Sequence, residues 1–386
     1  MTATRITPRD MLARLVAFDT TSYKGNIPLI EFIEAYLADW GVRSLRVDYE
    51  AGKKTNLYVT IGPDVAGGIV LSGHTDVVPA DSQDWSTDPF EMVEKDGLLY
   101  GRGTADMKGF LATALALVPD FKAAKLKTPI HLALSCDEEV GCFGVRPLVK
   151  YMKEHLPKPK AVIVGEPTLM KVVNAHKGAH TFATEVTGRE GHSSCTHLGV
   201  NSILVAGELL SEIGRLAAEM RERGDPSGRF SPPYTTVHVG LIEGGTAKNV
   251  IPKRCAFKWE TRLLPGADTN EVLDRFNRFA RGLEPEMQAV AAESGIRTDR
   301  TNAVPGLRPE QESPAEHLAL HLAEANGSEA VSYCTEAGLF QEIGIPTIIC
   351  GPGSIEDAHK PDEFIAISEM EKCATFMKKL IRHCLN

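Results

Sequence analysis

Short apolar runs alternate with longer amphipathic stretches along much of the chain. The apolar runs lie at 56–61 (NLYVTI), 69–72 (IVLS), 130–135 (IHLALS), 161–164 (AVIV) and 345–350 (IPTIIC). Runs of this length predict strands that are buried on both faces of a sheet. Helical periodicity is found at 7–17, 28–41, 108–118, 144–155, 314–325 and 369–384. Strands that alternate with helices predict an α/β domain with a mostly parallel sheet covered by helices.

The middle of the chain follows a different pattern. An alternating segment at 180–188 precedes an amphipathic stretch at 200–221 and a loop rich in Gly, Pro and Ser at 224–233. Two strand-like segments, a helix near 268–283 and a last strand follow, at 235–244, 255–264 and 295–302 for the strands. This order predicts an inserted α+β domain over 178–303. Residues 1–177 and 304–386 would then form the α/β domain.

Composition narrows the class of protein. The chain has 386 residues and a net charge of −9, which argues against nucleic acid or an anionic membrane as the main partner. No apolar stretch approaches the roughly 18 residues that span a bilayer, and the N-terminus lacks the apolar core of a signal peptide. The eight cysteines are dispersed without a CxxC pair, which is typical of reduced thiols. Together these features predict a cytoplasmic protein.

Histidines and carboxylates follow nearly every predicted buried strand. In open α/β sheets, functional sites form beyond the carboxyl ends of the strands. We therefore expect these side chains to meet at one edge of the sheet, although they come from distant segments. The candidates are His74, Asp76, Asp106, Glu138, Glu139, Glu166 and His359.

Such a set predicts a metal centre. Imidazole and carboxylate ligands without thiolate suit zinc or a similar divalent ion. Even five ligands from this set of seven are too many for one catalytic ion, but they suit two ions about 3.5–4 Å apart that share one carboxylate. Two dications would also make the neighbouring Glu138 and Glu139 tolerable. One of these two could bind metal while the other moves a proton.

Taken one at a time, the same residues have ordinary structural interpretations. A single histidine after a strand often lies in the core or at the surface, and Asp106 could cap the following helix. Glu166, before a proline, could belong to a turn. His317 and His321 lie four apart on a predicted helix, but no Glu follows His317, so we interpret them as residues of a helix face. The coincidence at the strand ends favours the metal centre.

Five blocks of sequence carry a family resemblance. They are GHTDVVP (73–79), DWSTDPFEMVEKDGLLYGRGTADMKG (84–109), CDEEVG (136–141), GEP (165–167) and GPGSIEDAHKPDEF (351–364). These blocks resemble the M20 family of metallopeptidases and deacylases with two catalytic metal ions. The resemblance implies that His74 and Glu166 hold one ion, that Glu139 and His359 hold the other, and that Asp106 bridges them. It also implies zinc, with cobalt as an alternative, and a cis peptide bond between Asp106 and Met107.

The resemblance implies roles for further residues. Glu138 would be the general base, and Asp76 would orient the metal-binding His74. The inserted domain resembles the lid and dimerisation domain of the family, so that a homodimer is expected. In it, GREGHSS (188–194) carries His192, which would reach across the dimer to the partner's active site and stabilise the oxyanion. From local sequence alone, His192 could equally be a turn residue.

The substrate is indicated by matches outside the metal site. GGTAKNVIP (244–252) and KWETRLLP (258–265) nominate Asn249 and Arg262, with Arg262 as partner of the substrate α-carboxylate. Arg262 could instead form a surface ion pair. Gly338 matches a loop lining the substrate pocket. The block at 335–364 is most similar to family members that remove the acetyl group from N2-acetylornithine during arginine biosynthesis.

Other functions share the predicted site. Succinyl-diaminopimelate desuccinylase, N-acyl-amino-acid amidohydrolase and dipeptidase activities would use the same metal ligands and differ only in the substrate pocket. A different class is a metal-binding dimer without catalytic activity. Such a protein would have no use for Glu138 beside a full set of ligands, so Glu138 favours an enzyme.

Overall fold

The computed structural model describes residues 4–385 and divides the chain into two compact units. The first unit comprises Met1–Ala175, Leu307–Ala330 and Thr335–Asn386. The second comprises His176–Gly306 and Val331–Cys334. The first unit is therefore assembled from segments that come before and after most of the second unit in the sequence.

An eight-stranded sheet forms the centre of the first unit. Its four middle strands, β6, β3, β7 and β16, run parallel to one another. Strand β2 is antiparallel to β6 and β1 is antiparallel to β2, while β8 is antiparallel to β16. In sheet order the strands are β1 (Ser44–Tyr49), β2 (Lys54–Ile61), β6 (Ile130–Ser135), β3 (Ile69–His74), β7 (Ala161–Pro167), β16 (Thr347–Gly351), β8 (Val173–His176) and β15 (Glu329–Val331).

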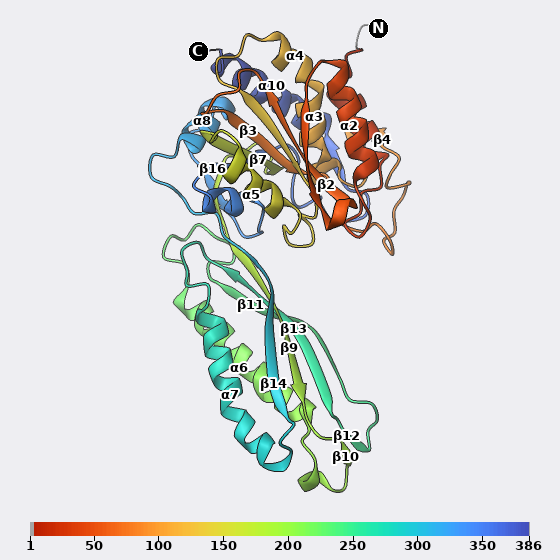
Figure 1. The fold of residues 1–386 in the computed structure, drawn as a ribbon, viewed down its shortest axis with the longest axis vertical. Helices are drawn as coiled ribbons and strands as arrows, with labels where there is room; N and C mark the ends of the chain where they lie inside the picture. The colour runs from red at the N-terminus through yellow and green to blue at the C-terminus, as the bar shows by residue number, and fades with distance from the viewer. Residues whose placement is uncertain (1–3, 386) are drawn as a thin grey trace. The chain divides into compact units, whose positions relative to one another are not determined.

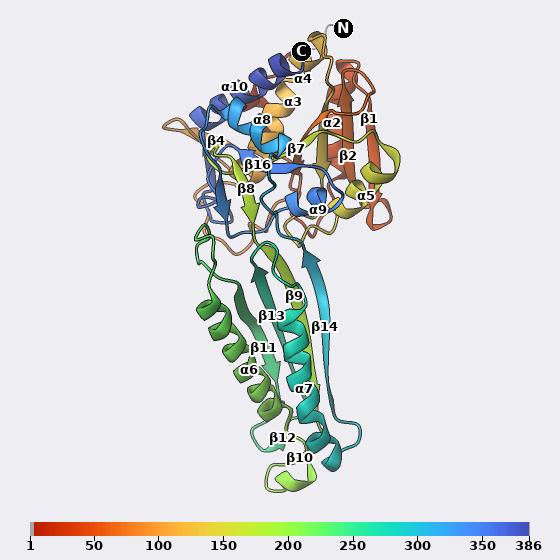
Figure 2. The same cartoon turned by 90° about the vertical axis from the view of Figure 1, so that its left-hand side faces the viewer.

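Helices cover both faces of this sheet (Figures 1 and 2). One large hydrophobic core contains residues from α1, α2, α3, α4, α8 and α10, whereas α5 and α9 pack against each other and against the sheet elsewhere. The mostly parallel, helix-covered sheet confirms the predicted fold class. The helices are α1 (Pro8–Val16), α2 (Ile27–Asp39), α3 (Gly109–Ala116), α4 (Val118–Ala123), α5 (Val145–His155), α8 (Pro314–Ala323), α9 (Ala337–Glu342) and α10 (Ile367–His383).

Short elements complete the first unit, and one of them carries the candidate residue Asp106. The Thr104–Lys108 segment (η2) is a single wide helical turn that leads into α3, and the Asp106–Met107 peptide bond within it is cis, as the resemblance implied. A small sheet of β17 (Phe364–Ala366), β5 (Leu98–Tyr100) and β4 (Val93–Lys95) lies in the same unit. A short 3₁₀ turn, η1 (Glu50–Gly52), joins β1 to β2.

The second unit is an antiparallel sheet with two helices on one face. Figure 2 shows α6 (Ser202–Arg223) and α7 (Glu271–Val290) against strands β11 (Thr236–Gly244), β13 (Arg254–Leu263), β9 (Gly178–Thr187) and β14 (Gly295–Val304). Phe182 and Trp259 stack at 4.1 Å between ring centroids in the core beneath the helices. A two-stranded sheet of β10 (Gly191–His192) and β12 (Val250–Ile251) and the turn η3 (Thr196–Leu198) complete the unit. The elements follow the predicted α+β order.

The described residues contain neither a membrane-spanning helix nor a disulfide bond. Among residues 4–385, no helix combines the length and apolarity needed to cross a membrane. No disulfide bond joins the cysteines in this part of the chain.

Candidate metal centre

Three neighbouring parallel strands bring the candidate residues to one edge of the main sheet. His74 is the last residue of β3, which lies between β6 and β7. Glu138 and Glu139 follow β6, and Glu166 lies near the end of β7. Because these strands run in the same direction, their carboxyl ends meet at one edge. His74, Glu138, Glu139 and Glu166 therefore lie at the same edge of the sheet, as expected.

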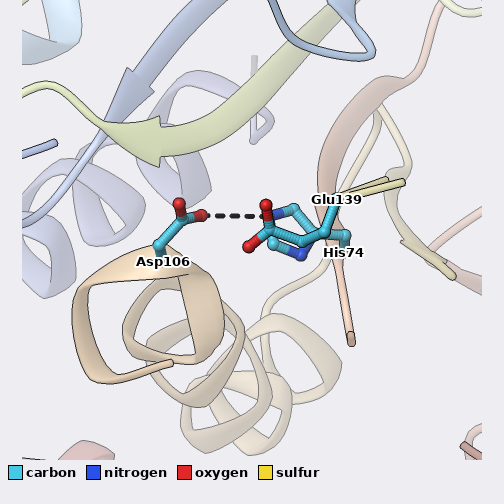
Figure 3. A group of neighbouring side chains, drawn as sticks. All are labelled: His74, Asp106 and Glu139. Atoms are coloured by element: carbon cyan, nitrogen blue, oxygen red, sulfur yellow. Dashed lines mark hydrogen bonds and ion pairs between the residues drawn. The ribbon is translucent and has the colours of Figure 1, made fainter. Parts of the chain in front are cut away.

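His74 contacts two of the predicted metal ligands. The imidazole is buried, and its Nε2 lies 3.0 Å from Oδ1 of Asp106 and 3.7 Å from Oε1 of Glu166. Figure 3 shows His74, Asp106 and Glu139 facing one another from three different segments. The other ring nitrogen, Nδ1, lies 2.9 Å from the backbone oxygen of Asp76. This contact fixes Nδ1 as the donor and leaves Nε2 as the nitrogen that can bind a metal.

Asp106 lies between the two histidines. Its Oδ1 faces His74, and its Oδ2 lies 3.2 Å from Nε2 of His359. The same His359 nitrogen lies 3.1 Å from Oε2 of Glu139. One oxygen of Asp106 therefore faces His74, which lies near Glu166. The other oxygen faces His359, which lies near Glu139. These contacts are compatible with the two ligand groups that the family resemblance implies, and Glu139 also lies near His74; the assignment of ligands to two ions stays a prediction.

The site is short of positive charge. Burial raises the pKa of Glu138 to about 8 and that of Glu139 to about 7, because removal from water disfavours the charged carboxylate. Hydrogen bonds to Asp106 and Glu139 raise the pKa of His359 to about 10. Burial acts against the charge of Asp106, but hydrogen bonds from His359 and His74 outweigh it and lower the pKa. Carboxylates thus outnumber the cationic groups that the protein places around them.

The donor atoms fit divalent ions. Ligand atoms of His74, Asp106 and Glu139 all lie within 4.8 Å of one another, and so do those of His74, Glu138 and Glu166. Within the described residues, Oε1 of Glu139 and Oε1 of Glu166 are buried and accept no hydrogen bond. Buried carboxylate oxygens normally have a donor or a cation beside them. The unpartnered oxygens and the excess of carboxylates therefore both fit a pair of bound cations.

Asp76 has a different position from the one that its predicted role requires. Its Oδ1 is 3.7 Å from Nδ1 of His74, which is too long for a hydrogen bond, and its backbone oxygen takes that place. The carboxylate instead accepts from the Ser22 hydroxyl at 2.8 Å and from the backbone N–H groups of Glu138 and Glu139 at 3.2 and 3.3 Å. Asp76 thus orients His74 through its main chain and the acidic loop through its side chain.

Asp137, the remaining carboxylate of the acidic run 137–139, does not face the site. Asp137 is buried, and both of its oxygens lie 2.7 Å from Nζ of the buried Lys54. Lys54 also donates to the backbone oxygen of Ser22 at 2.7 Å. Part of the positive charge that makes the acidic run tolerable therefore comes from Lys54. Sequence reasoning missed this residue, whose only signal was a lysine at the start of a buried strand.

Glu138, the predicted base, has a thiol beside it. Sγ of Cys142 lies 3.2 Å from Oε1 of Glu138, within the distance at which a thiol donates a hydrogen bond. Cys142 lies four residues after Glu138 in the same loop, and its own backbone has a left-handed conformation with φ of 57°. In the sequence Cys142 follows the acidic residues 137–139, and nothing local indicates this contact.

The remaining predicted residues lie on other elements. Gly338 is buried in α9 of the first unit, whereas the other three belong to the second. Pairing of β10 with β12 places His192 opposite Val250 and so next to Asn249. Nδ1 of His192 lies 2.7 Å from the Ser194 hydroxyl. Arg262 forms two hydrogen bonds of 3.1 Å with Glu260, so that its guanidinium is paired on the surface of the second unit.

Comparison with known proteins identifies the family. The sequence pattern described as peptidase family M20/M25/M40 matches residues 70–383. The chain belongs to this family. Membership confirms the resemblance drawn from the motifs and makes the chain a metal-dependent amide hydrolase.

Individual relatives extend the comparison over the whole chain. An acetylornithine deacetylase of Myxococcus xanthus is 38% identical over 382 residues, which are 97% of each chain. Among solved structures, aminopeptidase PepT of Bacillus cereus superposes with a TM-score of 0.74 at 20% identity over 100% of both chains. The YXEP protein of Bacillus subtilis, described as a dinuclear metal-binding peptidase of the M20 family, has a TM-score of 0.68 at 16% identity over 98% and 97%. These two structures show that the M20 fold is shared.

The Lys54 and Asp137 pair in this M20 protein gives a first prediction. Lys54→Met should lower the free energy of unfolding by about 3–5 kcal/mol, because it leaves the Asp137 carboxylate buried without its cation. Urea denaturation at pH 7.5 measures this. The double variant Lys54→Met/Asp137→Leu removes both charges and should recover most of the loss. A double variant as unstable as the single one would show that the charge of Asp137 is not the cause.

Proposed function

We propose that this M20 protein removes the acetyl group from N2-acetyl-L-ornithine and releases L-ornithine and acetate. The observation that carries the proposal is the full-length similarity to proteins named acetylornithine deacetylase, at 38% identity in Myxococcus xanthus and 36% in Yersinia pseudotuberculosis. Residues 335–364, which resemble the corresponding block of family members that act on N2-acetylornithine, agree with this proposal. The same proposal assigns the reaction to arginine biosynthesis. Cytoplasmic location stays a prediction from the dispersed cysteines.

Two divalent ions would be held by the clustered side chains. His74 and Glu166 would bind one ion, Glu139 and His359 would bind the other, and Asp106 would bridge them. The mixed imidazole and carboxylate donors favour zinc, with cobalt as a second candidate. When bound, such a pair polarises an acyl carbonyl and lowers the pKa of water toward neutrality.

Glu138 would move the proton. Its half-buried side chain lies beside the ligand cluster, where it would accept a proton from the attacking water and return it to the leaving nitrogen. The Cys142 thiol and the loop held by Asp76 support the orientation of this carboxylate. Hydrolysis then yields acetate and the free amine.

The second unit would supply the contacts with substrate. Asn249 and His192 are neighbours through the β10 and β12 pair, so that one rigid corner could present both. Nε2 of His192 would stabilise the oxyanion of the tetrahedral intermediate. Arg262 would bind the α-carboxylate in place of Glu260, since a surface ion pair of this kind is worth only about 0–1 kcal/mol. Gly338 in α9 would line the pocket.

A homodimer formed through the second unit is part of this proposal. Strand β11 is nine residues long and lies at the edge of the four-stranded sheet, where no strand within residues 4–385 pairs with its outer side. Leu241 and Ile242 on it are 63% and 54% exposed. Long exposed edge strands with apolar side chains pair readily with another chain. A second copy of this chain would cover this edge, and His192 would act in the partner's active site.

A parallel assay separates the proposed substrate from the alternatives. With zinc or cobalt added, the protein should release amine from N2-acetyl-L-ornithine but not from N-succinyl-diaminopimelate, and chelation should abolish the release. Turnover of the succinyl compound alone would retain the hydrolytic site and overturn the substrate. Turnover of neither compound with metal bound would direct the search to other acyl amino acids and dipeptides.

The base assignment predicts a separation of binding from chemistry. Glu138→Gln should lower kcat by about 10²–10⁴-fold, because the proton acceptor is lost. Both metal ions should remain bound, as measured by elemental analysis. Near-normal turnover by this variant would remove Glu138 from the role. If this variant loses both a metal ion and its turnover, Glu138 is instead a metal ligand. Its distance to His74 and Glu166 permits that role.

Sharing of sites across a dimer can be tested by complementation. Glu138→Gln and His192→Ala variants should each be nearly inactive as homodimers. In a mixed dimer, one of the two active sites has both an intact Glu138 and an intact His192 from the partner. About half of the wild-type activity per mixed dimer is therefore expected after the subunits are exchanged. Mixed dimers that are confirmed by affinity tags but inactive would contradict the role across the subunits.

A further inference from the structure

Glu363 is a buried carboxylate that has no part in the predicted ligand set. It lies four residues after His359 and directly before β17, and its exposed fraction is 1%. Its Oε1 accepts hydrogen bonds from the backbone N–H groups of Ala105 and Asp106, at 2.9 and 3.0 Å. Its Oε2 accepts from the N–H of Gly103 at 3.0 Å. Three backbone donors of the segment that carries Asp106 therefore converge on one side chain.

The shape of this segment explains the convergence. Gly103 has φ of +83°, and the following wide turn departs from helical geometry at Asp106 and Met107. Backbone N–H groups in such a conformation point into a common concavity, which suits an anionic group. A side chain at position 103 would meet Val77 Cγ1 at 2.7 Å. Position 103 therefore requires glycine, and the Glu363 carboxylate occupies the concavity formed by the N–H groups.

Arg102 connects Glu363 to the loop of the second histidine ligand. Nη1 of the buried Arg102 lies 2.7 Å from Oε2 of Glu363, and Nη2 donates to the Gln83 side chain. Gln83 in turn donates from Nε2 to the backbone oxygen of His359 at 2.9 Å. The planar guanidinium thus joins the Asp106 segment to the His359 loop. These are the two elements whose side chains meet at 3.2 Å in the candidate metal centre.

We propose that Glu363 is a positioning residue that fixes Asp106 between His74 and His359, so that one carboxylate can serve both metal positions. The proposal rests on the proposed metal ligands but not on the identity of the substrate. A carboxylate shared by two ions has to present each oxygen in a different direction, which requires a fixed backbone. Glu363 supplies this by holding the N–H of Asp106 itself. Residues that orient metal ligands in this way typically change metal affinity or activity by about 10–100-fold when they are replaced.

The competing interpretation is a purely structural ion pair with Arg102. In that case any group that satisfies Arg102 would suffice at position 363. Glu363→Asp distinguishes the two roles, because it keeps a negative charge opposite Arg102, whereas a carboxylate that is one methylene shorter cannot reach all three backbone N–H groups. Glu363→Gln tests the reverse, since it keeps the length but replaces one acceptor oxygen by an NH₂ group that faces donors.

The experiment titrates zinc or cobalt into metal-free protein by calorimetry and counts bound ions after dialysis. Wild-type protein should bind two ions per chain. Glu363→Gln and Glu363→Asp should both bind the second ion at least tenfold more weakly and lose the magnetic coupling of a dicobalt centre. In the proposed substrate's presence, kcat should fall about 10–100-fold with little change in KM. Because metal binding is measured without substrate, an incorrect substrate assignment leaves this result intact.

A matched control is Glu369→Gln, which changes a buried glutamate of α10 that pairs with Lys372. It should bind two ions with wild-type affinity. Wild-type metal binding and coupling in both Glu363 variants would overturn the proposal. Recovery by Glu363→Asp alone would support the structural ion pair instead. If Glu363→Gln does not fold, as judged by circular dichroism and Tm, Glu363→Asp decides the question, since it retains the charge opposite Arg102.

Discussion

The cost of gathering carboxylates in a buried place is the constraint on which the first unit depends. Parallel strands bring their carboxyl ends to one edge, and there the ligand atoms of Glu138 and Glu166 lie within 4.8 Å of one another, as do those of Glu139 and Asp106. Like charges at this distance raise one another's pKa values and destabilise the fold unless cations accompany them. Lys54 neutralises Asp137, and the two histidines lie against Asp106. Divalent ions would supply the remaining charge, so that folding stability and metal binding are linked.

The way the irregular backbone is held explains how such a cluster keeps its shape. Regular strands position His74 and Glu166 directly, because both lie within a sheet whose neighbours are hydrogen-bonded on both sides. Asp106 and the acidic loop have no such support. Each is instead held by a carboxylate that accepts backbone N–H groups, Glu363 for the Asp106 segment and Asp76 for the loop of Glu138 and Glu139. The two irregular elements are thus stabilised by the same device at two different places.

Much of the first unit could be predicted from the sequence, because the signals are local. Apolar runs located the buried strands, and the residues after them located the edge of the sheet where His74 and the glutamates meet. The division of ligands into two groups around Asp106 required the family resemblance, since no spacing in the chain indicates that a side chain is shared. Lys54 and Glu363 escaped prediction for a common reason. Each acts through a contact with another segment that hydrophobic periodicity does not encode, 83 residues away for Lys54 and Asp137 and 257 for Glu363 and Asp106. Cys142 contacts Glu138 within one loop, and no pattern in the sequence indicates that contact.

The order of segments along the chain has a consequence for biosynthesis. Strand β16 lies between β7 and β8 in the main sheet, and His359 follows it, yet both come after the whole second unit in sequence. A nascent chain that has emerged only as far as residue 306 can complete the second unit except for Val331–Cys334, while the first unit lacks a central strand and a metal ligand. Non-local pairing of this kind is slow, and incomplete sheets expose strand edges. The first unit therefore closes only after β16 and His359 have been synthesised, and a product truncated before β16 would carry a main sheet that lacks one of its central strands.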